Sequence, residues 1–118
     1  MKVLIFEPGK HPRAADIEHT LEEMQKIVGG YIQAVYPWRE SAALVCDDEG
    51  LLKEYPFNRR IGDEHMIFGT FFICGLDTEN FTDLSPELMQ KYSMEYFDPQ
   101  MLMQTPFGLV VLPVEAEA

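Results

Sequence analysis

The chain has 118 residues, of which 47% are hydrophobic and 25% charged, so it is long enough for one domain with a real core. Its net charge is −11, with 9 lysines and arginines against 20 aspartates and glutamates, which disfavours direct binding to nucleic acid or to an anionic membrane surface. No apolar run approaches the roughly 20 residues that a membrane-spanning helix requires, so we expect no membrane segment.

The first half of the chain predicts a helix at about 21–28 with strands on both sides. Thr20 and Glu23 have the spacing of a helix capping box, and Gly29-Gly30 is a typical helix stop. Apolar residues recur on one face of this helix, which we expect to pack on a sheet. The other elements expected here are a strand at Lys2–Phe6, a turn at Glu7–Lys10, a return strand at Arg13–Glu18, and strands at Tyr31–Tyr36 and Ala42–Cys46.

The second half predicts one long buried strand, a second helix and a last strand. Met66–Cys74 is the most hydrophobic run, and we expect it to be a single central strand with a bulge or a close backbone approach at Gly69. Leu51–Ile61 is predicted to be irregular, because Pro56 argues against a central strand. The remaining expected features are a helix capped by Ser85, with Leu88, Met89 and Tyr92 facing the core, and an apolar strand at Phe107–Leu112.

These elements indicate an α+β fold with two helices and a largely antiparallel sheet of about five or more strands, because helices and strands do not alternate regularly. We expect residues 1–113 to form a single α+β domain, followed by a flexible acidic tail at 114–118. Cys46 and Cys74 lie in apolar runs and predict two buried free thiols, with a disulfide as the alternative. Few cysteines, and an N-terminal apolar run that ends at Glu7, indicate a cytoplasmic protein without a signal peptide.

Four segments of the first 75 residues form a recognisable series. They are MKVLIFEPGK, IVGGYIQAVYP, ALVCDDEGLLKEYPFNRRI and GTFFICG. In this order they resemble domain-of-unknown-function family 3846, which is found on phages, plasmids and conjugative elements of bacteria. The resemblance implies a small cytosolic protein of a bacterial or phage mobile element. It implies no activity and no catalytic residues.

The adjacent basic residues Arg59 and Arg60 are the preferred candidate for a ligand site. Arginine side chains suit planar carboxylate and phosphate groups, and aromatic faces suit bases. An anionic, nucleotide-like small ligand is therefore one hypothesis, and a plain surface turn whose arginines pair with the acidic half of the chain is the other. The candidate ligand-binding residues are Tyr36, Trp38, Tyr55, Phe57, Asn58, Arg59 and Arg60, with Tyr31 as a further aromatic side chain.

The acidic charge is concentrated in the second half of the chain. Residues 1–60 hold 8 basic and 10 acidic residues, a balance of −2, whereas residues 61–118 hold 1 and 10, a balance of −9. This asymmetry fits a solvated face, or a surface that docks on a basic protein or imitates nucleic-acid phosphate. The candidate protein-contact residues are Asp77, Glu79, Asp83 and Glu87.

The remaining candidates are a methionine-rich stretch near the C-terminus and the scattered histidines. Methionines and aromatics near the C-terminus fit either core filling or an adaptable protein-binding face. The histidines and cysteines lack the close spacing of metal ligands, and no catalytic constellation is visible, so we expect no metal, no cofactor and no enzymatic activity. The methionine-rich stretch consists of Met89, Tyr92, Met94, Tyr96, Phe97, Met101 and Met103.

The favoured hypothesis is a non-enzymatic, small acidic interaction protein of a phage or mobile element that binds a protein partner. The most specific form of this hypothesis is an anti-defence or anti-restriction factor that binds a host protein. The alternative is a protein that binds or sequesters a nucleotide-type small ligand. A contiguous acidic face would favour the first hypothesis, and a preformed pocket or cleft would favour the second.

Overall fold

The fold is built on one antiparallel sheet. A computed structural model of the chain describes residues 1–117. The strands of the largest sheet are β1 (Lys2–Phe6), β2 (Arg13–Asp16), β3 (Ile32–Val35), β4 (Ala42–Asp47), β7 (Phe71–Asp77) and β8 (Asn80–Thr82). Their order is β2-β1-β7-β4-β3, with β8 also paired to β7, and every pairing is antiparallel. The predicted α+β fold with a largely antiparallel sheet is therefore confirmed.

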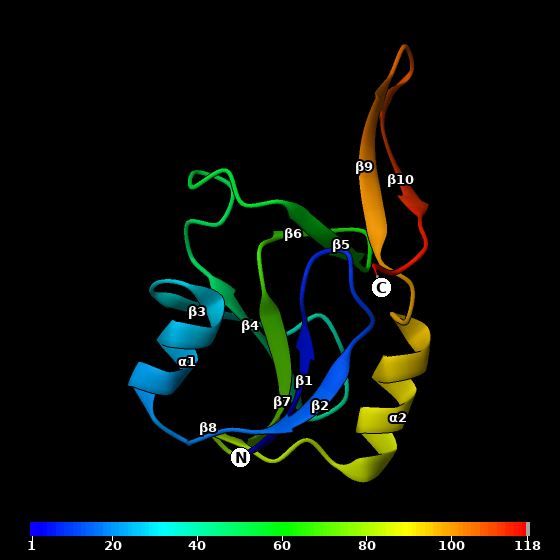
Figure 1. Cartoon of the computed structure of the whole chain (residues 1–118). Coiled ribbons are helices and arrows are strands. Elements are labelled where there is room, and N and C mark those ends of the chain that lie inside the picture. The colour runs from blue at the N-terminus through cyan, green and yellow to red at the C-terminus, as the bar shows by residue number, and fades with distance from the viewer. Residues whose placement is uncertain (118) are drawn as a thin grey trace.

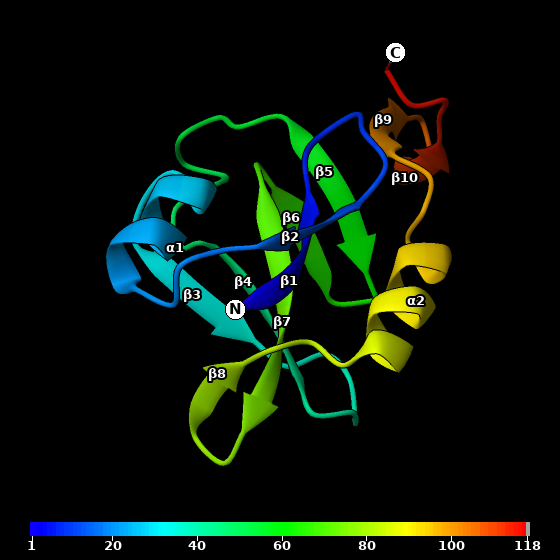
Figure 2. The same cartoon turned by 60° about the horizontal axis from the view of Figure 1, so that its bottom comes forward.

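Two helices and two hairpins complete the structure. They are α1 (Leu21–Val28), α2 (Pro86–Glu95), the hairpin of β5 (Phe57–Ile61) with β6 (His65–Phe68), and the hairpin of β9 (Gln100–Thr105) with β10 (Gly108–Pro113). α1 covers one face of the sheet, whereas α2 and the β5–β6 hairpin cover the other (Figures 1 and 2). The β9–β10 hairpin projects away from this body (Figure 1).

Both faces of the central strand β7 are buried. Phe72 packs with Met24 and Val28 on the α1 side, and Phe71 stacks on Phe6 on the α2 side with ring centroids 4.7 Å apart. Phe71 and Phe72 are both 0% exposed, and β7 lies between β1 and β4. A continuous apolar run is typical of a strand that is covered on both faces.

The helix α1 begins and ends where its sequence predicts. Thr20 Oγ1 accepts a hydrogen bond from the backbone N of Glu23 at 3.2 Å, and Gly29 ends the helix with a left-handed φ of 95°. Lys53 Nζ and Tyr55 OH donate to the carbonyl oxygen of Gly29 at 3.4 and 3.2 Å. The loop before β5 therefore satisfies the C-terminal end of α1.

The helix α2 also has its predicted start and its predicted buried face. Ser85 Oγ accepts from the backbone N of Leu88 at 3.2 Å. Tyr92 is fully buried, its hydroxyl donates to Glu40 Oε1 at 2.7 Å, and its ring stacks on Trp38 with centroids 4.5 Å apart. These contacts fix α2 against the connection between β3 and β4.

The apolar run Met66–Cys74 is not one strand, contrary to the prediction. Gly69 and Thr70 divide it between β6 and β7. Gly69 has a φ of 85°, and a Cβ at this position would lie 2.5 Å from the ring of Tyr55, so the turn requires glycine. Hydrophobicity alone could not reveal the break, because residues on both sides of it are buried.

The prediction of an irregular Leu51–Ile61 is also wrong in its last part. The strand β5 begins at Phe57, directly after Pro56, and pairs with β6. Proline removes its own backbone donor but does not prevent a strand from starting at the next residue. Asn58, Arg59 and Arg60 consequently lie in a strand and not in a surface turn.

The chain returns to the body after the projecting hairpin. The backbone N of Val114 donates to the carbonyl of Pro99, and the backbone N of Glu117 donates to the carbonyl of Gly9, each at 2.8 Å. Residue 118 of the expected tail lies outside the described residues, and the flexibility of the tail stays a prediction.

The buried side chain of Arg59 joins three parts of the fold. Arg59 is 0% exposed. Its Nε donates to the carbonyl of Tyr96 at 2.8 Å, and its Nη2 donates to the carbonyls of Lys10 and Phe97 at 2.7 and 3.2 Å. Its Nη1 donates to Asn58 Oδ1 at 2.8 Å. We call this set of five residues the Arg59 lock, because it ties β5 to the β1–β2 turn and to the end of α2.

The charge of Arg59 is matched by the end of a helix. Burial lowers the pKa of Arg59 to about 10, while Asp98 opposes that shift, so the side chain is protonated at neutral pH. The last carbonyls of a helix have no partner within the helix and carry partial negative charge. The guanidinium therefore satisfies carbonyls at the end of α2 and compensates part of its own desolvation.

We predict that Arg59→Met lowers the free energy of unfolding by about 3–5 kcal/mol, because it leaves several buried acceptors without a donor. Arg60→Met is the matched control, since Arg60 is exposed and its change should stay within about 0.5 kcal/mol. Urea unfolding followed by circular dichroism measures both. Arg59→Lys, which keeps the charge but not the planar fork, should fall between them. Equal losses for Arg59→Met and Arg60→Met would contradict the lock.

We predict that Cys46 and Cys74 resist thiol reagents in the folded protein. Both are buried free cysteines that face opposite sides of the sheet, and burial is the main cause that raises their pKa values, to about 11 and about 12. Thiol titration at mildly alkaline pH should find almost no reaction before unfolding and two thiols per chain after it. Rapid reaction of the folded protein would show that one of these strands opens.

Candidate protein-binding arm

The β9–β10 hairpin, residues 100–113, is called the arm from here on. Its strands pair in register, with Met101 opposite Leu112 and Met103 opposite Val110. At its root the backbone N of Arg60 donates to Gln100 Oε1 at 2.8 Å. Beyond this root the arm extends away from the body (Figure 1).

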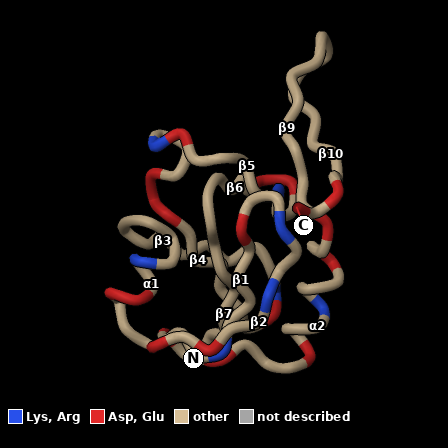
Figure 3. Tube along the Cα trace, in the orientation of Figure 1, with Lys and Arg blue, Asp and Glu red and all other residues tan. Residues whose placement is uncertain are grey.

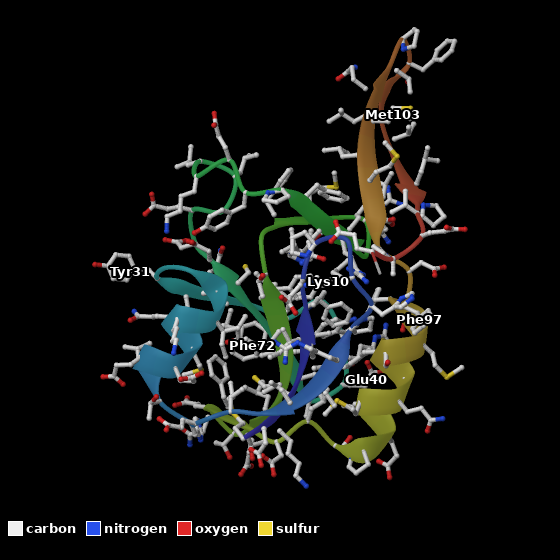
Figure 4. The ribbon with its side chains drawn as sticks, viewed as in Figure 1. Lys10, Tyr31, Glu40, Phe72, Phe97 and Met103 are labelled. Carbon is white, nitrogen blue, oxygen red and sulfur yellow. The ribbon has the colours of Figure 1, made fainter. Side chains whose placement is uncertain are left out.

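The arm exposes apolar side chains along its length. Phe107, at the tip, is 100% exposed, and Leu109 is 60% exposed. Figure 4 shows Met103 on the arm, beyond the root where β5 contacts β9. The large hydrophobic residues that the arm exposes are Met101, Met103, Phe107, Leu109, Val110 and Leu112.

The arm is also the uncharged part of an acidic chain. Residues 99–114 contain no aspartate, glutamate, lysine or arginine, and they form the longest such stretch of the sequence. In Figure 3 the arm is tan from root to tip, whereas acidic segments occur on several sides of the body. Contacts made by the arm would therefore rest on apolar burial and backbone hydrogen bonds, and not on charge.

The root of the arm is held firmly by the body. Tyr96 and Phe97, which precede the arm, belong to the Arg59 lock. The ring of Phe97 also stacks on His11 with centroids 3.9 Å apart, and His11 Nδ1 lies 3.0 Å from the carbonyl oxygen of Phe97. The arm thus leaves the body from a fixed point.

The polar residues of the predicted ligand site are largely used inside the protein. Asn58 and Arg59 are both 0% exposed. Asn58 Nδ2 donates to the carbonyls of Phe6 and Gly69 at 2.9 and 2.8 Å, and Arg59 forms the lock. Arg60 is the exposed member of the group. Binding of an anionic ligand here stays a prediction, with Arg60 as its accessible cation.

The aromatic candidates occupy separate packing sites. Trp38 stacks on Tyr92 of α2, and Tyr55 lies at the end of α1. The ring of Phe57 meets the ring of Phe68 edge to face, with ring centroids 5.4 Å apart. The aromatic candidates that remain mostly exposed are Tyr31, at 72%, and Tyr36, at 58%, and Figure 4 shows Tyr31 pointing away from the body. The structure does not assemble these side chains into one aromatic site.

A pocket of about 350 Å³ opens between the β3–β4 edge of the sheet, the loop after β4 and the strand β6. Its lining includes Cys46 and His65 together with three acidic residues, Asp47, Asp48 and Glu64. Carboxylates repel phosphate groups, so this pocket is a poor site for a nucleotide. Within residues 1–117, no group of three or more His, Cys, Asp or Glu side chains is placed to hold a metal ion.

The four acidic contact candidates lie at the end of the body away from the arm, near β8 and the start of α2 (Figures 1 and 3). All four side chains are exposed. Asp83 Oδ1 accepts a hydrogen bond from the backbone N of Lys2 at 2.8 Å, so this residue also has a structural contact. Acidic segments elsewhere on the body show that the negative charge is not confined to this end (Figure 3). The four candidates are Asp77, Glu79, Asp83 and Glu87.

The strand β9 is, with β5 and β8, one of the strands that the sequence analysis did not predict. A signal was present, because Gln100–Thr105 and Gly108–Pro113 are two uncharged runs separated by the two residues Pro106-Phe107, a common hairpin spacing. The methionines at 101 and 103 fitted either a core or a binding face, and the structure leaves them 40% and 39% exposed. Core filling is therefore not their role within the described chain.

Neither helix of residues 1–117 is long and apolar enough to cross a membrane. No curated protein and no solved structure is detectably similar to the chain. The family described as Domain of unknown function (DUF3846) matches residues 1–97. This match ends at Phe97, within the Arg59 lock, and the arm lies beyond it. The chain therefore belongs to the DUF3846 family, and its arm follows the part of the chain that the family defines.

Proposed function

We propose that this chain is a non-enzymatic protein-binding module whose arm pairs with an extended, uncharged segment of a protein partner. The observation that carries this proposal is the arm itself, a projecting hairpin that is apolar and uncharged. Within residues 1–117, β10 pairs with β9 alone, so its outer edge presents unpaired backbone groups. An extended segment that adds to such an edge gains both backbone hydrogen bonds and apolar contacts.

The cost of leaving the arm uncovered supports the same proposal. An isolated two-stranded hairpin is marginally stable in water, and apolar patches of this kind are typical of interaction sites. Phe107 and Leu109 are the two most exposed large hydrophobic side chains of the arm, and covering each of them would contribute about 2 kcal/mol to binding. A partner would therefore stabilise the arm as well as bind it.

The outer edge of β10 lacks the usual devices that prevent strand pairing. Lysines, prolines within the strand and inward-pointing charges are the common protections of edge strands. β10 has the sequence Gly-Leu-Val-Val-Leu-Pro, with no charge and with proline only at its last position, Pro113. An unprotected edge is a liability unless it has a binding role.

The proposal also covers the class of partner and the kind of genetic element that encodes the protein. The net charge of −11 and the resemblance to a family of mobile elements support a cytoplasmic phage or mobile-element protein that binds a host protein, including the anti-defence role. The carboxylates lie on several sides of the body and not on one face (Figure 3). This distribution favours the arm as the binding element over an acidic surface that imitates nucleic-acid phosphate.

We predict that a photoreactive benzophenone side chain at position 107 forms covalent adducts with one recurring protein in cells that express this chain. The reason is that Phe107 is fully exposed at the tip of the arm. The matched control places the same group at Leu52, an apolar residue of the body that is 80% exposed. Mass spectrometry identifies the adducts, and the mass shows whether the partner is this chain or another protein.

The double change Met101→Asp with Met103→Asp should remove the adducts at position 107 while the thermal unfolding of the body stays unchanged, since the core clusters contain no residue of the arm. Equal adduct yields from positions 52 and 107, or none from position 107, would contradict the proposed binding role of the arm.

A further inference from the structure

We infer that the segment bound by the arm is the arm of a second copy of this chain, so that the protein forms a two-fold symmetric dimer. This inference rests on the proposed binding role of the arm, and it names a second copy of this chain, in place of a host protein, as the partner that the arm binds. The two β10 strands would pair antiparallel at their outer edges, and the product would be a four-stranded sheet in the order β9-β10-β10-β9.

The arm is complementary to itself. A two-fold axis perpendicular to the new sheet runs the second β10 antiparallel to the first, which antiparallel edge pairing requires. The same axis keeps each side chain on the same face, so Val110 would meet either Val110 or Leu112 of the second copy. Every such meeting places apolar against apolar, and no charge is buried, because residues 99–114 contain none.

The negative charge of the body also favours association through the arms over association through the bodies. Two bodies with a net charge of −11 repel each other wherever their surfaces meet. Paired arms place the bodies at opposite ends of the new sheet, and six-residue strands span about 20 Å. This is more than twice the Debye length of about 8 Å at physiological ionic strength, so much of the repulsion is screened. The arm is the part of the chain through which two copies can meet at low electrostatic cost.

The test uses two double variants of the full chain, one that adds two negative charges to β10 and one that adds two positive charges at the same positions. Variant E carries Val110→Glu and Leu112→Glu, and variant K carries Val110→Lys and Leu112→Lys. In either register of the symmetric dimer, each variant places like charges opposite each other, so its dimer dissociation constant should rise by roughly 100-fold. Sedimentation velocity at micromolar concentrations measures the native chain, each variant alone and the two variants mixed.

We expect the native chain to sediment as a dimer and each variant alone as a monomer. The mixture of variants E and K should recover the dimer, because unlike charges then meet across the two arms. Leu52→Glu, which changes an exposed apolar residue of the body, should leave the native dimer intact. A monomeric native chain, or a mixture that stays monomeric, would overturn the inference.

Salt gives a second and independent readout. Added sodium chloride should tighten the native dimer, because it screens the repulsion between the acidic bodies. Dissociation on adding salt would overturn the inference, since it would indicate an attraction between charged surfaces. Co-sedimentation of the monomer with phosphatidylcholine vesicles would also overturn it, because the arm would then be a lipid-binding element.

Different results would contradict the dimer and the protein-binding role of the arm. If the native chain is monomeric but position 107 still crosslinks to a different protein, the binding role of the arm stands and the second copy is wrong. If position 107 gives no adduct and the chain is monomeric, both are wrong.

Discussion

The buried guanidinium of Arg59 is the contact on which the placement of the other parts depends. It donates hydrogen bonds to carbonyls of the β1–β2 turn and of the end of α2, and it lies over the ring of Phe6 at 5.1 Å. A buried charge without such partners would be strongly destabilising, so β5, α2 and the turn must assemble together. Because the arm begins three residues after Phe97, the same contact fixes the point from which the arm projects.

Local patterns predicted the elements whose structure is decided locally. The helix α1 was predicted with its correct bounds, because a capping threonine, an apolar face and a glycine stop all act within one short stretch. The same reasoning gave the start of α2 at Ser85 and the β1–β2 hairpin. The burial of Phe71 and Phe72 followed from the apolar run alone.

Predictions failed where distant residues decide the outcome. Gly69 predicted a bulge or a close backbone approach, but nothing near it in the sequence shows that the ring of Tyr55 packs there or that the apolar run divides into two strands. Arg59 looked like a surface cation because its acceptors come from residues 10, 96 and 97, far along the chain. An apolar strand near the C-terminus was predicted, but its place was not: its one partner strand in the described chain, β9, is equally apolar and leaves the body with it. An apolar sequence indicates that its side chains become buried, but it does not tell whether the same chain or a partner covers them.

The body has its core without the arm, because neither core cluster contains a residue of 100–113. The proposed dimer requires that the free edge of β10 bind a second copy. Hydrogen exchange of the β10 amides, followed over a range of protein concentrations, measures whether this edge is covered. We expect rapid exchange at the outer edge in dilute protein and strong protection in concentrated protein, while amides of the body do not change. Exchange of β10 that stays rapid at every concentration would contradict the dimer.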